Sequence, residues 1–265
     1  MLSGYGNYFS AQKAIDRFKW LIKRIVQILI PFIFCFIYVT AVQIIFFHNL
    51  VSQDYLRNFI TLSIPGTTTW YLKIQILLYA LLALAVIINR DNSHYILCGL
   101  VVVYIVIAYF IKMDDWWYMT SLCFPLGYLF GKYKDKFTSG LKSLPFLIIS
   151  GCLFAVAFIG YRVFGSTVLQ ITYFLFFVIT VTALLFCFGV SSKILAFVGK
   201  HSVYVYLIHI GLAMPCYNQI SSIWIATGVY MLLTTFGSGI CRLISEPLSK
   251  CLSDRLLRSE NKKAE

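Results

Sequence analysis

The stretch IVQILIPFIFCFIYVTAVQIIFF, residues 25–47, decides the fold class of this chain. It contains no charged side chain and has the length, roughly 17 to 25 residues, that a helix needs to cross a bilayer. Backbone N–H and C=O groups find no water in the hydrocarbon core, so an apolar run of this length satisfies them by forming a helix. We therefore predict that residues 25–47 are a transmembrane helix.

The rest of the chain has the same character. Of its 265 residues 60% are hydrophobic and only 12% are charged, and the mean hydropathy is +0.83. This composition leaves too little polar surface for a soluble globule, so we predict an all-α, polytopic transmembrane helix bundle of about eight spans. The spans are expected at residues 25–47, 70–88, 96–111, 116–131, 144–164, 168–190, 202–220 and 223–243. The fifth and sixth are so close that they should form a tight hairpin.

The distribution of Lys and Arg predicts the orientation of the spans. With the N-terminus inside, only Arg57, Lys112 and Arg162 fall in outer loops and Lys73 falls within a span, while all other Lys and Arg lie inside. Positively charged short loops stay on the cytoplasmic side, so both termini are predicted to be cytoplasmic. We divide the chain into a membrane domain, residues 1–252, and a polar cytoplasmic tail, residues 253–265. Within the domain, residues 1–24 are expected to form a basic interfacial arm, with an amphipathic helix over residues 11–24, ahead of the bundle at 25–243.

Two function classes are not expected. The formal net charge of +12 follows the pattern that membrane topology demands, so we predict no nucleic-acid partner. The eight cysteines are scattered singly, without C-x-x-C pairs or a histidine at ligand spacing, so we predict no metal site.

The most informative polar residues lie in the seventh span. Ser202, Tyr206 and His209 are four and three residues apart, so they form one polar stripe on an otherwise apolar helix. His209 lies about 10 Å along the helix from Ser202. A neutral imidazole at that depth could act as a general base or bind a ligand carbonyl, or it could be a packing hydrogen bond to a neighbouring helix.

Three other positions allow two interpretations each, and a fourth has one expected partner. Lys73 could snorkel to the membrane surface or contact substrate, and Trp70 beside it could be an interfacial anchor or a substrate contact. Arg24 could bind phosphate groups or fix the topology. Glu246 is expected to pair with Arg242, four residues earlier.

Five stretches resemble the acyltransferase 3 family, integral membrane proteins that O-acylate polysaccharides and other surface glycans. They are LSGYG at residues 2–6, KRIVQILIPF at 23–32, TTTWYLKIQILLY at 67–79, FPLGYLFGKYKDK at 124–136 and GKHSVYVYLIHIGL at 199–212. The five stretches follow the order of the family, and together they extend over nearly the whole chain.

This sequence departs from the pattern of the family in two places. In the family a phrase like LSGYG closes the second of about ten helices, so we expect the first helix and most of the second, with an essential arginine and histidine, to be absent here. No residue of this sequence matches that pair. Where the family often reads R-x-x-R, Arg24 fits the first position and Gln27 occupies the second.

The resemblance implies transfer of an acyl group, probably acetyl, from cytoplasmic acyl-CoA (acetyl-CoA) to a hydroxyl of a cell-surface or membrane-linked glycan. From the residues themselves we expect Lys23 and Arg24 to hold the donor and Ser202, Tyr206, Trp70 and Lys73 to contact the acceptor. His209 is the candidate for the catalytic base, although it does not correspond to the family's own histidine. Membrane lipid surrounds such a protein, and a bacterial inner membrane is the expected location. The alternatives are a transporter or flippase component and an inactive truncated acyltransferase.

Overall fold

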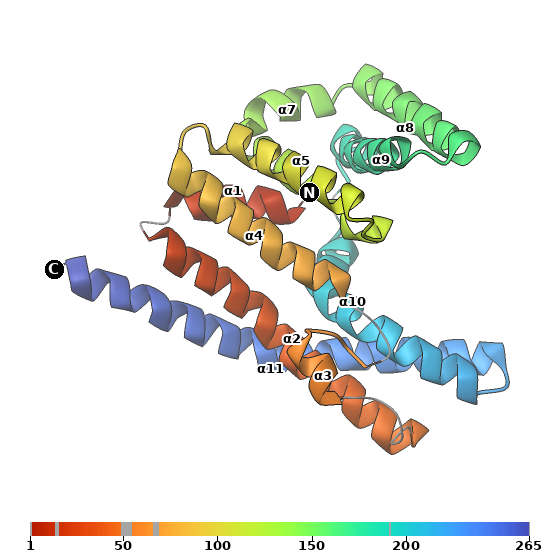
Figure 1. Cartoon of the computed structure of the whole chain (residues 1–265). Coiled ribbons are helices and arrows are strands. Elements are labelled where there is room, and N and C mark those ends of the chain that lie inside the picture. Colours follow the sequence, from red (N-terminus) through yellow and green to blue (C-terminus); the bar gives the residue numbers. More distant parts are fainter. Residues whose placement is uncertain (1, 14–15, 49–54, 66–68, 191, 265) are drawn as a thin grey trace. The chain divides into compact units, whose positions relative to one another are not determined.

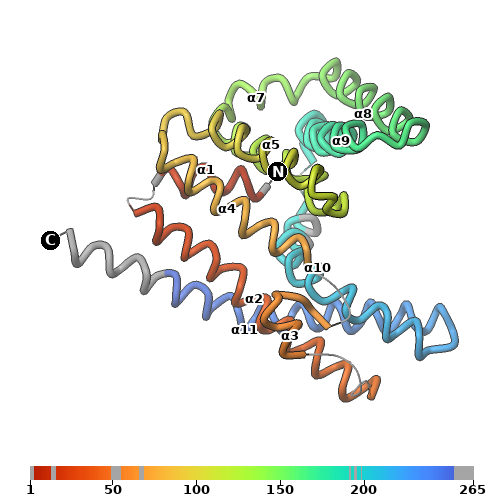
Figure 2. Tube along the Cα trace, in the orientation of Figure 1, coloured from red at the N-terminus to blue at the C-terminus, as the bar shows by residue number. Residues whose placement is uncertain are grey.

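A computed structural model describes residues 2–13, 16–48, 55–65, 69–190 and 192–264 (Figures 1 and 2). Within these residues it is all-helical, as predicted. The chain divides into two compact units, of which unit 1 comprises residues 1–20 and 74–192 and unit 2 comprises residues 21–73 and 193–265. Each unit is built from segments distant in sequence.

The helices have the following bounds. They are α1 (Leu2–Lys13), α2 (Arg17–Phe47), α3 (Tyr55–Ile60), α4 (Trp70–Ile88), α5 (Ser93–Phe110), the 3-10 helix η1 (Asp115–Trp117), α6 (Cys123–Lys132), α7 (Lys134–Leu141), α8 (Leu144–Phe164), α9 (Thr167–Cys187), α10 (Lys193–Gln219) and α11 (Ile223–Ala264).

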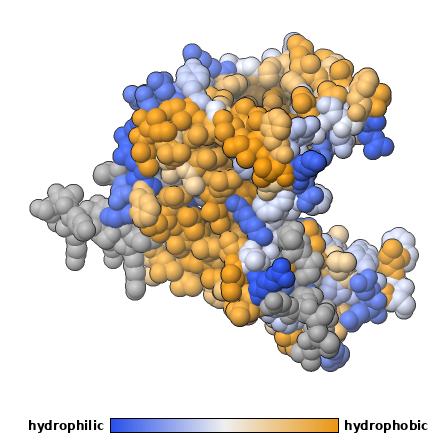
Figure 3. All heavy atoms as spheres, viewed as in Figure 1, coloured by the Kyte–Doolittle hydropathy of each residue, from blue (hydrophilic) through white to orange (hydrophobic). Residues whose placement is uncertain are grey.

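Six of the described helices are long and apolar enough to cross a membrane. They are α2, α4, α5, α8, α9 and residues 223–253 of α11, and they correspond to six of the eight predicted spans. Many of their apolar side chains face outward, for example Val156 and Phe164 (69% and 77% exposed). Apolar side chains cover much of the visible surface (Figure 3). This is the surface that lipid requires of an integral membrane protein.

The prediction of one continuous helix over residues 116–131 was wrong. Those residues form η1, a series of turns and α6, which has only 10 residues. Asp114 and Asp115 precede the segment, and the turns at residues 118–122 leave a helix shorter than the thickness of a bilayer requires. The span expected at 202–220 lies in α10, a helix of 27 residues that is not among the six candidate spans found within the described part of the chain.

In unit 1, α8 and α9 pack side by side as the predicted hairpin (Figure 1). Ser143 caps α8 by accepting a hydrogen bond from the Phe146 N–H, and Gly165 ends the helix in the left-handed conformation with φ = 63°. Only Gly165 and Ser166 separate the two helices.

The close packing of α1 against α6 depends on Gly4. A Cβ at this position would collide with the Phe124 carbonyl oxygen and would lie 2.9 Å from the Tyr128 nitrogen, whereas a Cβ at Gly6 would meet nothing within 4 Å. The LSGYG stretch thus provides a helix face that lets two backbones approach each other.

The basic residues from Arg17 onward are the first turns of α2, so the helix expected over residues 11–24 is not a separate element, and residues 21–47 of α2 belong to unit 2. Gln43 ties α2 to the rest of the unit: its buried amide donates to the carbonyls of Pro65 (3.1 Å) and Gly211 (2.8 Å). The residues assigned to the tail continue α11 as far as Ala264.

Candidate functional site

The polar stripe predicted on α10 borders a cavity of unit 2. Ser202, Tyr206 and His209 line a space of about 490 Å³, which we call the histidine cavity. Thr235, Ser238 and Gly239 of α11 form part of its wall, together with His201 and Tyr230. The helical spacing therefore identified residues that share one cavity.

The hydrogen bonds of His209 define which nitrogen carries its proton when the ring is neutral. Nδ1 lies 2.7 Å from the Tyr206 carbonyl oxygen and 3.1 Å from that of Val205. A carbonyl only accepts, so Nδ1 is the donor and Nε2 keeps its lone pair. A neutral imidazole in this tautomer can accept a proton at Nε2, as a general base must.

Aromatic rings connect His209 to the start of α4. The Tyr206 and His209 centroids are 5.8 Å apart, Tyr71 and Tyr206 are 5.2 Å apart, and Trp70 and Tyr71 are 6.1 Å apart. The Tyr71 backbone N–H also donates to the Tyr206 hydroxyl at 3.3 Å. Tyr71 thus orients Tyr206.

The other predicted acceptor contacts lie differently. Ser202 lines the cavity, but its hydroxyl donates a hydrogen bond to the Gly199 carbonyl at 2.8 Å. Lys73 Nζ lies 3.3 Å from the Ser63 hydroxyl. Neither Trp70 nor Lys73 is among the residues described as lining the histidine cavity. Trp70 is connected to the cavity only through the ring of Tyr71, which contacts Tyr206.

His201 is a functional candidate that the sequence analysis passed over. Its Nε2 lies 2.9 Å from Nη1 of Arg242, and its ring packs on Phe197 at 4.3 Å. The guanidinium has only N–H donors, so His201 accepts at Nε2 and carries its hydrogen on Nδ1. The spacing of eight residues between His201 and His209 places both on one helix face, which was the available signal.

Arg242 also forms the predicted pair with Glu246. Its Nε donates to Glu246 Oε2 at 2.8 Å, which confirms the prediction from the four-residue spacing. Arg242 therefore holds His201 and Glu246 at the same time.

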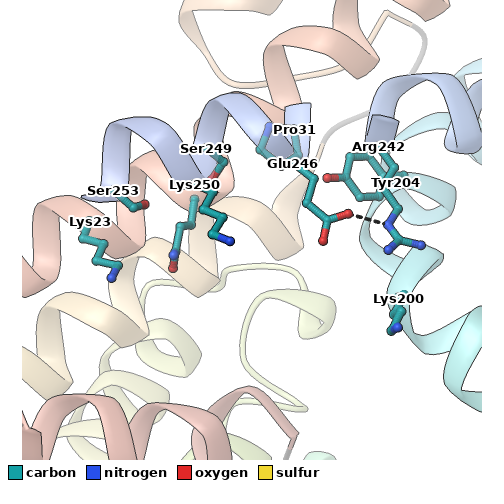
Figure 4. Close-up of a pocket in the computed structure, with 10 residues that line it drawn as sticks. Lys23, Pro31, Lys200, Tyr204, Arg242, Glu246, Ser249, Lys250 and Ser253 are labelled. Carbon is teal, nitrogen blue, oxygen red and sulfur yellow. Dashed lines mark hydrogen bonds and ion pairs between the residues drawn. The ribbon is translucent and has the colours of Figure 1, made fainter. Parts of the chain in front are cut away.

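A second space in unit 2, which we call the cationic cavity, has a volume of about 470 Å³ (Figure 4). Four cationic side chains line it: Lys23 of α2, Lys200 of α10, and Arg242 and Lys250 of α11. Glu246 is the one carboxylate among its described lining residues, with hydroxyls from Tyr204, Ser249 and Ser253. Its electrostatic character suits a ligand with several negative charges.

Of the two residues predicted to hold the donor, Lys23 lines the cationic cavity. Arg24 is not among the lining residues described, and its Nη1 donates to the Gln27 side-chain oxygen at 3.0 Å. Gln27, at the second position of the basic pair, does line the cavity. Lys200 and Lys250 come from distant parts of the chain, so no local motif could have joined them to Lys23.

The described residues contain no group of three His, Cys, Asp or Glu side chains close enough to hold a metal ion. No curated protein and no solved structure matches the chain. A family model does match: the acyltransferase 3 model, described as an acyltransferase domain, covers residues 1–243. With this match over most of its length, together with its membrane-spanning helices, the chain belongs to the acyltransferase 3 family.

Proposed function

We propose that this protein transfers an acetyl group from acetyl-CoA to a hydroxyl of a cell-surface or membrane-linked glycan, in a bacterial cytoplasmic membrane. The observation that carries the proposal is the cationic cavity, where four cations face one carboxylate. Family membership supports acyl transfer in a membrane setting. The cavity adds the feature that a donor rich in phosphate would need.

The donor interaction follows from charge. Coenzyme A carries several phosphate groups, and lysine and arginine bind phosphate by charge-assisted hydrogen bonds. In the proposed complex Lys23, Lys200 and Lys250 neutralise these phosphates while Arg242 adds N–H donors. Arg24 acts beside them, through its contact with Gln27.

The acceptor would occupy the histidine cavity. His209 Nε2 takes the proton of the glycan hydroxyl, and the oxygen attacks the thioester carbonyl of the donor. The tetrahedral intermediate collapses, the C–S bond breaks, and the departing thiolate takes the proton back from His209. Tyr206 and Ser202 orient the acceptor, with Trp70 and Lys73 further out.

Membranes that contain this protein provide the test, with incorporation of radiolabel from acetyl-CoA into glycan as the readout. Lys200→Gln and Lys250→Gln should each raise the KM for acetyl-CoA about five-fold, roughly 1 kcal/mol, with little change in kcat. Lys112→Gln, which removes an exposed lysine from a loop of unit 1, is the matched control. Equal KM values for all three variants would contradict the assignment of the donor to this cavity.

The base is tested in the same membranes. His209→Gln should lower kcat at least a hundred-fold, because a general base typically contributes about 10²- to 10⁴-fold. His48→Gln, at an exposed position, controls for the loss of an imidazole. Full transfer by His209→Gln would remove His209 from the mechanism, and no label in any form would leave the proposed reaction without support.

A further inference from the structure

Unit 1 contains a groove that the proposed reaction does not use. It has a volume of about 400 Å³ and lies between α9 and residues of three other helices, namely Tyr5 of α1, Phe130 of α6 and Lys134 of α7. Lys134 is the one charged side chain among its described lining residues. The groove is therefore mainly apolar, with one cationic side chain among its described lining residues.

The floor of the groove is firmly packed. Phe130 is 8% exposed and belongs to a buried cluster with Leu141 and Ala183. Its ring lies 5.4 Å from Tyr5 and 6.0 Å from Phe186. Thr182, the hydroxyl-bearing residue on the α9 wall, donates to the Val178 carbonyl at 2.7 Å, so its hydroxyl is turned to the helix backbone. Such a surface offers dispersion contacts to an apolar chain.

The length of the groove fits one leaflet of a bilayer. Its α9 wall extends from Phe177 to Phe186, which is roughly 14 Å at 1.5 Å per residue. The hydrocarbon core is about 30 Å thick, so one leaflet contributes about 15 Å. Phe186 lies next to the end of α9 at Cys187, and Phe177 lies near the middle of the helix. The groove thus covers the half of α9 nearest its C-terminus.

The lysines near the groove indicate the charge of the ligand that it would bind. Lys132, Lys134, Lys136 and Lys142 lie close together in the sequence, at the end of α6 and in and just after α7. The Lys132 ammonium is engaged, 3.0 Å from His94 Nδ1 and 2.9 Å from the Asp91 carbonyl oxygen. Lys134 borders the groove and is exposed. A basic side chain beside an apolar channel at a membrane surface is complementary to an anionic lipid phosphate.

We propose that this groove is a binding site for one anionic phospholipid, with an acyl chain along α9 and its phosphate on Lys134. Lys134 binds the headgroup by charge, and the acyl chain of the lipid packs against Phe130, Phe177 and Phe186. The groove shares no described lining residue with either cavity of unit 2, so the proposal does not depend on the proposed reaction.

The test counts bound lipid by native mass spectrometry on the full-length protein, purified in an uncharged detergent. The probes are phosphatidylglycerol, phosphatidylcholine, a free fatty acid and glycerol phosphate. We expect phosphatidylglycerol to bind at least five-fold more tightly than phosphatidylcholine, and glycerol phosphate alone not to bind. A preference for the free fatty acid over phosphatidylglycerol would overturn the assignment of a phospholipid.

Two pairs of variants locate the site. Val181→Trp fills the groove and should reduce phosphatidylglycerol binding at least ten-fold, while Val156→Trp on the exposed surface of α8 should not. Lys134→Gln should weaken binding about five-fold, and Lys142→Gln, which removes an equal charge nearby, should leave it unchanged. Lys134→Gln is a conservative exposed change that keeps the test valid should Val181→Trp fail to fold. Unchanged affinity in Lys134→Gln would overturn the proposal.

Discussion

At the scale of single residues, Gln43 shows how a membrane bundle uses a polar side chain. It is fully buried, and its amide donates to two carbonyls from separate parts of unit 2, those of Pro65 and Gly211. Leucine in its place would leave both carbonyls without this donor. We expect Gln43→Leu to lower the free energy of unfolding by about 1–3 kcal/mol, measured by thermal or denaturant unfolding in detergent.

The matched control for Gln43 is Gln219→Leu. Gln219 donates one hydrogen bond, to the Phe47 carbonyl at 2.9 Å, from an exposed position. Water can replace that bond, so the loss should be under about 1 kcal/mol. Equal losses in the two variants would show that burial does not determine the strength of these bonds.

The same scale shows what sequence alone could provide for the site. Spacing along one helix grouped Ser202, Tyr206 and His209 correctly, because a helical period is a local property. It also gave the pairing of Arg242 with Glu246. The contact between Arg242 and His201 joins positions 41 residues apart, and no local pattern records it.

At the scale of elements, the contact between α1 and α6 depends on a missing side chain. Gly4→Val would force a Cβ into the Phe124 carbonyl, whereas Gly6→Val enters open space on the same helix. We expect Gly4→Val to destabilise unit 1 by about 1–3 kcal/mol and to expose α1 to proteolysis. Limited proteolysis in detergent, with Gly6→Val as the control, measures this, and equal cleavage in both variants would argue against the close contact.

The sequence predicted which segments form helices better than it predicted where those helices begin and end. Apolar runs located six membrane-crossing helices, but α2 begins at Arg17 rather than near residue 25. Basic residues such as Arg17 and Lys19 end an apolar run without ending a helix, because Lys and Arg are good helix formers. At residues 118–122 the reverse holds: apolar and aromatic residues form turns that interrupt the expected helix, and hydropathy does not register them.

At the scale of the whole molecule, orientation remains a prediction from Lys and Arg. It places Lys142 inside and Lys112 outside, and both side chains are exposed. Single cysteines at these positions, in a background without the exposed Cys152 and Cys251, should react differently with an impermeant maleimide. In intact cells only Lys112→Cys should be labelled, and labelling of Lys142→Cys there would reverse the topology.

Arg242 has a consequence for the order in which substrates can be added. A guanidinium carries five N–H groups, and its bonds to Glu246 and His201 use two of them. Three remain for an anion in the cationic cavity, so donor binding does not require Arg242 to release His201. For the proposed reaction this predicts random-order addition: initial-rate plots should intersect, and an acceptor analogue should bind whether or not coenzyme A is present.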